Sequence, residues 1–183
     1  MKAPERHETR RLLLRRPRAD DAEAIFTRYA SDEDVTRYLA WPRHQTVDET
    51  RSFLQFSDAE WERHPCGPYL VESRDEGRLL GSSGLAFDSA DTASTGYVLA
   101  KDAWGCGYAT ETLHAIVKIA RELGVTLLYA LCHVDHAPSW RVLEKCGFSR
   151  VALMRGGVDF PNLEPDVPRD ALRYDLALDQ SAS

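Results

Sequence analysis

Cysteine is scarce in this sequence, and no group of residues has the spacing of a metal site. The four cysteines, Cys66, Cys106, Cys132 and Cys146, lie far apart and form no Cys-x-x-Cys pair. This pattern fits neither a zinc site nor a small disulfide-bonded domain. We therefore expect reduced thiols and no bound metal. Cys132 and Cys146 lie within apolar stretches, so both are expected to be buried as small apolar side chains.

Basic blocks and long apolar runs are also missing. The 29 acidic residues outnumber the 23 Lys and Arg residues, which gives a formal net charge of -6 and disfavours direct binding to nucleic acid. No apolar run approaches the roughly 20 residues of a membrane helix, and the polar segment Met1 to Arg11 lacks the apolar part of a signal peptide. We expect a cytoplasmic protein with no nucleic-acid and no membrane partner. The sequence leaves the oligomeric state open.

The chain length of 183 residues predicts a single domain over 1–183, with a core from about residue 9 to residue 178. Alternating leucines in Thr9–Arg16 predict a first strand. Acidic residues three positions after a capping residue, at Asp20–Glu23 and Thr46–Glu49, predict the starts of two helices. An aromatic loop, Tyr38 to Pro42, is expected between these helices.

The second half of the chain alternates short strand patterns with two helical ones. Apolar residues from Ala109 to Leu123 recur at helical spacing, and Gly124 is placed to end this helix. A nearly continuous apolar run over Val125–Cys132 predicts a strand covered on both faces. A shorter helix is expected from Pro138 to Cys146, with Gly147 as its stop. Further strands are predicted at 69–71, 79–81, 95–99, 151–154 and 171–178, with a Pro- and Asp-rich excursion over 156–169 before the last.

The segment Trp104-Gly105-Cys106-Gly107-Tyr108-Ala109-Thr110-Glu111 lies between the strand that ends at Leu99 and the most periodic helix. A strand, a glycine loop and a helix start form an anion-binding arrangement, because glycines admit a ligand close to the backbone and the helix start presents unpaired N–H groups. A pyrophosphate would fit there, although an ordinary strand-to-helix turn has the same pattern. A dinucleotide-binding oxidoreductase is disfavoured, because the third glycine of its motif falls at Thr110 and the strand ends too early.

A second stretch, Ala130 to Phe148, contains a strand end, a loop and a helix that ends in Glu144-Lys145-Cys146-Gly147-Phe148. Together with Trp104–Glu111, it resembles the GNAT superfamily of acetyl-CoA-dependent N-acetyltransferases. The family's pyrophosphate motif is written Q/R-x-x-G-x-G/A, and Trp104, Gly107 and Ala109 stand at its fixed places. The opening segments Thr9–Arg16 and Tyr38–Pro42 are similar to those of the RimJ and RimL branch of ribosomal-protein acetyltransferases, so the resemblance covers most of the chain.

The resemblance implies an α/β (α+β) GNAT fold, in which about four helices flank a mixed, mostly antiparallel, splayed sheet of six to seven strands. Acetyl-CoA would lie in the splay between Tyr97–Leu99 and Leu127–Cys132, with its pantetheine arm on the backbone of Val98 and Leu99. A primary amine, on a peptide N-terminus or a small molecule, would attack the thioester directly in a ternary complex. The implied cofactor-binding residues are Val98, Leu99, Trp104, Gly105, Cys106, Gly107, Tyr108, Ala109, Thr110, His136 and Ser139.

Three departures from the family pattern affect the catalytic residues. His136 stands where relatives often have Asn, Leu143 where many have a general-acid Tyr, and Ser94 where many have a Glu base. Ser139 is then the candidate for orienting the leaving sulfur, although it is equally a helix-start residue. His133 is the candidate for a water-relayed base, with an ordinary hydrogen-bonded histidine as the alternative. The same departures also fit an alternative function, a GNAT domain that binds acyl-CoA without catalysis.

Contacts to the acceptor amine, by the same resemblance, come from loops. The candidate loops are Tyr38 to Pro42, Asp88 to Ser94 and Gly156 to Asp166, and their mixed chemistry leaves the identity of the acceptor open. A site that lacks a carboxylate at position 94 is expected to prefer an amine of modest basicity, such as a peptide α-amine, over a lysine side chain.

Overall fold

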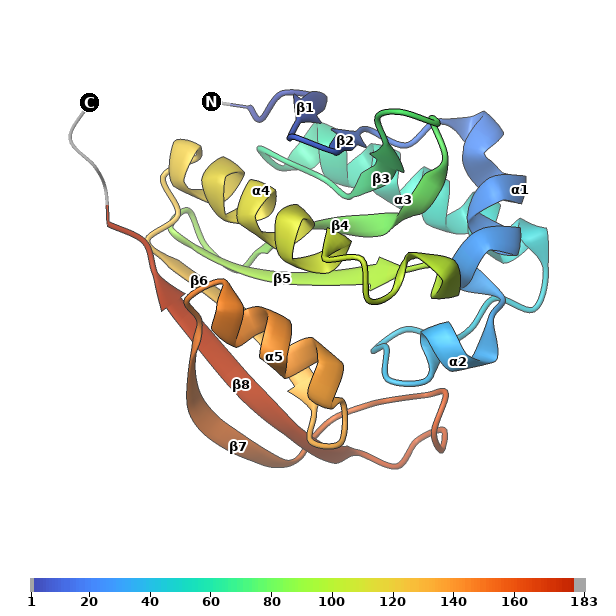
Figure 1. Ribbon diagram of the computed structural model, residues 1–183. Coiled ribbons are helices and arrows are strands. Elements are labelled where there is room, and N and C mark those ends of the chain that lie inside the picture. Colours follow the sequence, from blue (N-terminus) through green and yellow to red (C-terminus); the bar gives the residue numbers. More distant parts are fainter. Residues whose placement is uncertain (1, 180–183) are drawn as a thin grey trace.

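The computed structural model describes residues 2–179, in which one eight-stranded mixed sheet is covered by helices on both faces (Figure 1). The predicted domain 1–183 also includes residues 1 and 180–183, which lie outside the described part. The strands are β1 (Arg6–Glu8), β2 (Leu12–Arg15), β3 (Tyr69–Ser73), β4 (Leu79–Phe87), β5 (Thr92–Leu99), β6 (Leu127–His133), β7 (Ser149–Val158) and β8 (Arg169–Ala177). The helices are α1 (Ala22–Ile25), α2 (Glu33–Thr36), α3 (Val47–Arg63), α4 (Tyr108–Glu122) and α5 (Ala137–Lys145).

The two faces of the sheet have separate apolar cores. Neighbouring residues of one strand point to opposite faces, so Leu79 packs with α1 and α3 while Leu80 packs with α4. In Figure 1, α4 and α5 lie on one face and α1, α2 and α3 on the other. No helix within residues 2–179 combines the length and apolar character that crossing a membrane requires.

The sheet has the order β1-β2-β3-β4-β5-β6-β8-β7, and only β5 and β6 run parallel. These two strands pair over three residues, from Thr92 opposite Leu127 to Ser94 opposite Tyr129. Beyond that point both strands continue unpaired with each other, β5 to Leu99 and β6 to His133. The predicted splay between these strands is therefore confirmed.

Two counts differ from the expected six to seven strands and about four helices. The extra strand β1 comes from the polar leader, which pairs with β2 at the sheet edge. Its residues are mostly exposed, so no apolar alternation marked it. The helix expected after Asp20 is observed as α1 continued by a π-helical turn (Phe26–Ala30), and α2, which Asp32 caps, is an additional short helix. Asp20 does not cap it, because Asp20 lies inside a 3-10 turn (Ala19–Asp21) that begins after Arg18, and the Asp21 carboxylate accepts the Arg18 backbone N–H at 2.7 Å.

The other helix boundaries follow the predicted local signals. Glu49 accepts a hydrogen bond from the Thr46 backbone N–H at 3.2 Å, which completes the capping box of α3. Gly124 and Gly147 have φ values of 86° and 88° after α4 and α5, a conformation that favours glycine. Strand β6 is not covered on both faces as expected, because Leu131 is 39% exposed.

Candidate active site

The predicted pyrophosphate loop connects β5 to α4 through a 3-10 turn (Lys101–Ala103). Gly105 and Gly107 have φ values of 74° and 77°, and Gly107 is the N-cap residue of α4. An L side chain is strained in this left-handed conformation, so both positions favour glycine. The turn leaves the first N–H groups of the 15-residue helix α4 without intrahelical partners. These donors, with the positive end of the helix dipole, are suited to an anion.

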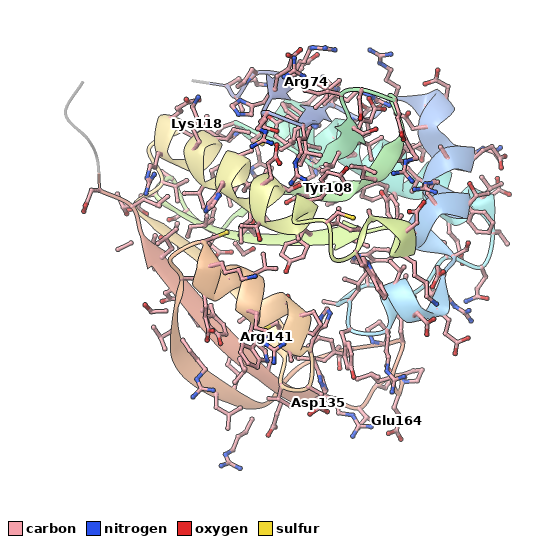
Figure 2. All side chains as sticks on the ribbon, viewed as in Figure 1. Arg74, Tyr108, Lys118, Asp135, Arg141 and Glu164 are labelled. Carbon is pink, nitrogen blue, oxygen red and sulfur yellow. The ribbon has the colours of Figure 1, made fainter. Side chains whose placement is uncertain are left out.

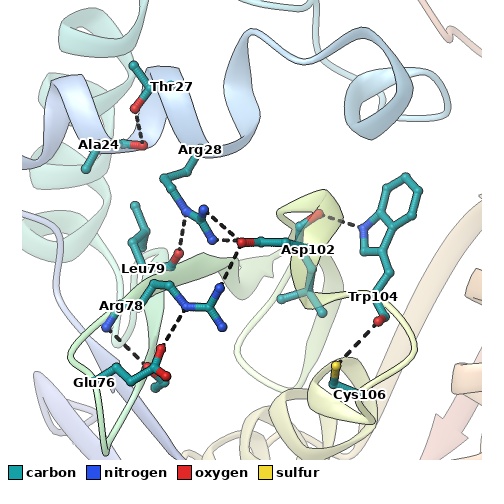
Figure 3. A network of polar contacts seen from close by, with 11 residues as sticks. Ala24, Thr27, Arg28, Glu76, Arg78, Leu79, Asp102, Trp104 and Cys106 are labelled. Atoms are coloured by element: carbon teal, nitrogen blue, oxygen red, sulfur yellow. Dashed lines mark hydrogen bonds and ion pairs between the residues drawn. The ribbon is translucent and has the colours of Figure 1, made fainter.

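An ion-pair network holds the beginning of this loop against the rest of the molecule. The Asp102 carboxylate accepts hydrogen bonds from Arg28 at 2.8 and 3.0 Å and from Arg78 at 2.8 Å (Figure 3). The hydrogen bond from Arg28 is the main reason that the pKa of Asp102 lies below its usual value. The indole N–H of Trp104 donates to the Leu99 carbonyl at 2.8 Å, which ties the loop to the end of β5.

A second network connects the loop to the β1–β2 turn. Glu111, in the first turn of α4, accepts hydrogen bonds from the Thr9 hydroxyl at 2.6 Å and from the Arg11 Nε at 2.7 Å. Burial opposes the ionisation of Glu111, but these hydrogen bonds outweigh it, so its pKa is lowered. Arg11 also donates to the Cys106 carbonyl at 2.9 Å and lies 4.6 Å from the ring centre of Tyr108, at the beginning of α4 (Figure 2). Arg11 thus places a positive charge beside the loop, and this charge compensates for the negative charge of the Glu111 carboxylate.

A cavity of about 520 Å³ occupies the splay between β5 and β6. Its lining includes Leu113 and Leu143, which pack on the α4 and α5 face, and Leu39 and Trp41, which pack on the opposite face. The cavity therefore has walls from both sides of the sheet, so two molecules can approach each other through it.

The hydrogen-bond pattern between β4 and β5 defines which backbone groups of β5 are directed at the splay. The Ala100 N–H donates to the Leu80 carbonyl of β4 at 2.7 Å. In an antiparallel ladder, hydrogen-bonded residue pairs alternate with pairs that are not hydrogen-bonded. The backbone N–H and C=O of Val98 are therefore directed at Ser82 of β4. The backbone groups of Tyr97 and Leu99 are directed at the splay. We therefore expect a pantetheine arm to pair with Tyr97 and Leu99, with Val98 contributing its side chain to the lining.

Ser139 lies at the start of α5 and lines the cavity. The Tyr97 hydroxyl donates to its side-chain oxygen and to its backbone carbonyl, each at 3.3 Å. Burial raises the pKa of Tyr97 to about 12, so the phenol stays protonated at neutral pH. The sequence pattern did not reveal this pair, because the two residues lie 42 positions apart. Ser139 is thus a cavity residue with a fixed hydroxyl donor behind it.

The two histidines of the predicted site have different surroundings. His136 lines the cavity, and its ring stacks on Tyr38 with 4.9 Å between the ring centres. His133 is only 6% exposed, is not among the lining residues, and packs between Tyr38 and the edge of Phe160. Burial lowers the pKa of both imidazoles. His133 Nδ1 accepts the Asp135 backbone N–H at 3.2 Å, so the neutral ring carries its proton on Nε2. This hydrogen bond occupies the lone pair that a base would use.

Asn162 joins two of the three predicted acceptor loops, a role that no local pattern indicated. Its side-chain N–H groups donate to the Thr36 carbonyl at 2.7 Å and the Trp41 carbonyl at 2.9 Å. Its side-chain oxygen accepts the Arg43 N–H at 2.7 Å. The 38–42 loop and the 156–166 loop therefore form one wall of the cavity. Of the third loop, only Ser94 lines it.

Ser94 and Leu143, the two other departures from the family pattern, both line the cavity. Among residues 2–179, no cluster of three or more His, Cys, Asp or Glu side chains could hold a metal ion. Cys106 is exposed in the loop, whereas Cys132 and Cys146 are buried, as predicted for the latter two.

Comparisons with known proteins agree with this geometry. A family model described as the acetyltransferase (GNAT) domain matches residues 11–149. YoaA of Bacillus subtilis, named an uncharacterized N-acetyltransferase, is 30% identical over 151 residues, which cover 81% of this chain and 85% of YoaA.

Solved structures share the fold. An acetyltransferase of the GNAT family from Bacillus anthracis superposes with a TM-score of 0.81 at 25% identity, over 94% of this chain and 98% of the other. RimL, the ribosomal L7/L12 alpha-N-protein acetyltransferase solved in complex with coenzyme A, gives a TM-score of 0.83 at 20% identity, over 98% and 99% of the two chains. The GNAT fold that the sequence resemblance implies is thus shared by these structures.

Proposed function

Because this chain belongs to the GNAT family of N-acetyltransferases, we propose that it transfers the acetyl group of acetyl-CoA to a primary amine, with a peptide α-amine as the acceptor. The observation that carries the proposal is the splay of β5 from β6 next to the N-terminus of α4. The part of β5 that does not pair with β6 suits a pantetheine arm, and the unpaired N–H groups of α4 suit a pyrophosphate. RimL, which has the same fold, was solved with coenzyme A.

In the proposed reaction both substrates are bound at once. The amine nitrogen forms a bond to the thioester carbonyl carbon, the carbon–sulfur bond breaks, and the electron pair stays on sulfur. The proton lost by the amine ends on that sulfur through solvent. Walls that come from both faces of the sheet allow the thioester and the amine to meet in the cavity, so the protein contributes orientation.

The residues that would handle protons are few. Ser139, supported by the Tyr97 hydroxyl, is suited to donate a hydrogen bond to the developing thiolate. The water-relayed base role of His133 stays a prediction, and its engaged Nδ1 does not favour it. Of the two imidazoles only His136 lines the cavity. An α-amine needs little help, because a substantial fraction of it is already deprotonated at neutral pH.

Replacing Ser139 with alanine is expected to lower kcat by about tenfold or more while changing acetyl-CoA binding little. The reason is that the hydroxyl is needed when charge develops on sulfur, not in the ground state. Tyr97→Phe should give a smaller fall, because it removes only the group that fixes the serine. Steady-state kinetics and calorimetry with CoA check both variants. A loss of binding with unchanged kcat would reduce Ser139 to a helix-start residue.

The proposed function is tested by measuring CoA release from acetyl-CoA with a panel of amines, with mass spectrometry of the products. We expect an acetylated amine and one CoA per turnover with at least one peptide. CoA binding without turnover of any amine would instead support the alternative, a non-catalytic acyl-CoA-binding domain.

A further inference from the structure

The cavity has an uncharged lining. Of the residues that line it, all within the described part of the chain, none is Asp, Glu, Lys or Arg, and His136 is its only titratable side chain near neutral pH. Burial lowers the pKa of His136, which favours its neutral form at pH 7. The charged residues Asp135, Arg141 and Glu164, labelled in Figure 2, are not among the lining residues. An acceptor thus finds no counter-ion inside.

This lining disfavours an acceptor that carries a charged group close to its reacting amine. A charged group that moves from water into the cavity loses hydration free energy, and no ion pair compensates for the loss. Water that remains in the cavity compensates for only part of it. Arg37 flanks the 38–42 loop, and its guanidinium lies 5.6 Å from the ring centre of Tyr38. A polycationic acceptor gains nothing from this neighbour.

Aromatic rings supply the remaining contacts on the acceptor side. Tyr38 and Trp41 come from one loop and Phe160 from the other, and all three line the cavity. Asn162 fixes the two loops to each other through three hydrogen bonds. Phe160 is 3% exposed and packs against His133, which anchors the 156–166 side of this wall. Preformed rings without charge are suited to apolar and aromatic groups.

We propose that the acceptor is a peptide N-terminus whose first side chain is uncharged and apolar or aromatic, which packs on the wall formed by Tyr38, Trp41 and Phe160. This inference rests on the proposed function and narrows its substrate class. It excludes polyamines, basic N-termini and acidic N-termini as preferred acceptors.

The first experiment uses three peptides that are identical except for Phe, Lys or Asp at the first position, and measures kcat/KM with acetyl-CoA at pH 7. The Phe peptide should be acetylated at least about tenfold more efficiently than either charged one, because only it avoids the uncompensated desolvation of a charge. Equal rates, or preference for the Lys or Asp peptide, would overturn the inference.

The second experiment places a carboxylate in the lining. Ala40 is an exposed alanine that lines the cavity, and Ala19 is an exposed alanine of the 3-10 turn Ala19–Asp21 that lies outside the lining and outside all three predicted acceptor loops. In Ala40→Asp the Phe-to-Lys ratio of kcat/KM should fall by at least about fivefold, because the new charge pairs with the lysine ammonium. In the matched control Ala19→Asp the ratio should not change. A ratio that Ala40→Asp leaves unchanged would contradict the inference.

Failure of the proposed function gives a different result from failure of this inference. If no peptide is acetylated, the proposed function fails, and the inference is then decided by calorimetric binding of the three peptides to CoA-loaded protein. Tighter binding of the Phe peptide supports it, and equal or charge-favoured binding overturns it.

Discussion

Gly107→Asp should weaken CoA binding by at least about tenfold while leaving the fold intact. Gly107 is the N-cap residue of α4 with φ 77°, and the nearest atom to an added Cβ is Arg11 Nη2 at 3.5 Å. A carboxylate there faces the same helix-start N–H groups that we expect to bind the pyrophosphate. It would satisfy those donors itself and repel the phosphates. Isothermal calorimetry with CoA measures the effect, and circular dichroism checks the fold.

Two controls separate charge from backbone strain. Gly107→Asn introduces a side chain of the same shape without charge, and asparagine tolerates the left-handed region, so its loss of affinity should be smaller. Gly124→Asp places the same strained aspartate at the far end of α4, where φ is 86° and no atom lies within 4 Å of the added Cβ. Its CoA affinity should match that of the wild type. A folded Gly107→Asp protein with unchanged affinity would contradict the assignment of the loop.

A second large effect is expected in kcat/KM, which should be higher for an α-amine than for a lysine amine. At pH 7, removing a proton from an α-amine of pKa about 7.8 costs roughly 1 kcal/mol, and from a lysine amine of pKa near 10.4 roughly 4.6 kcal/mol. Position 94 is serine, and no residue of the described cavity lining is Asp or Glu, so no carboxylate lowers the larger cost. The greater nucleophilicity of lysine offsets part of the difference. We expect kcat/KM at pH 7 to favour the α-amine by at least about tenfold.

The pH dependence gives an independent check with two matched peptides, one with a free N-terminus and one with only a lysine amine. For the α-amine, kcat/KM should rise with pH and level off above about 8, where the amine is already deprotonated. For lysine it should keep rising to about 10, so the preference narrows at high pH. Faster acetylation of lysine at pH 7 would refute the preference. No turnover at any pH would favour the non-catalytic alternative.

The features that the sequence determined by itself are set by residues that lie close together along the chain. The periodic apolar positions of α4 and the stops at Gly124 and Gly147 were predicted because helical spacing and a positive φ are local properties. The glycines of the loop before α4 were recognised for the same reason. Local patterns, read with the family resemblance, therefore gave the splayed sheet and its position between β5 and β6.

Only the tertiary structure decided which groups meet. The Tyr97–Ser139 hydrogen bond joins residues 42 positions apart, and Asn162 reaches the Trp41 carbonyl across 121 positions. Strand β1 forms by backbone pairing at an edge, which needs no apolar pattern. His133 is withdrawn from the cavity because Tyr38 and Phe160 cover its ring. Such contacts depend on packing between distant segments, and the chemistry of each residue type alone does not specify a partner in the folded chain.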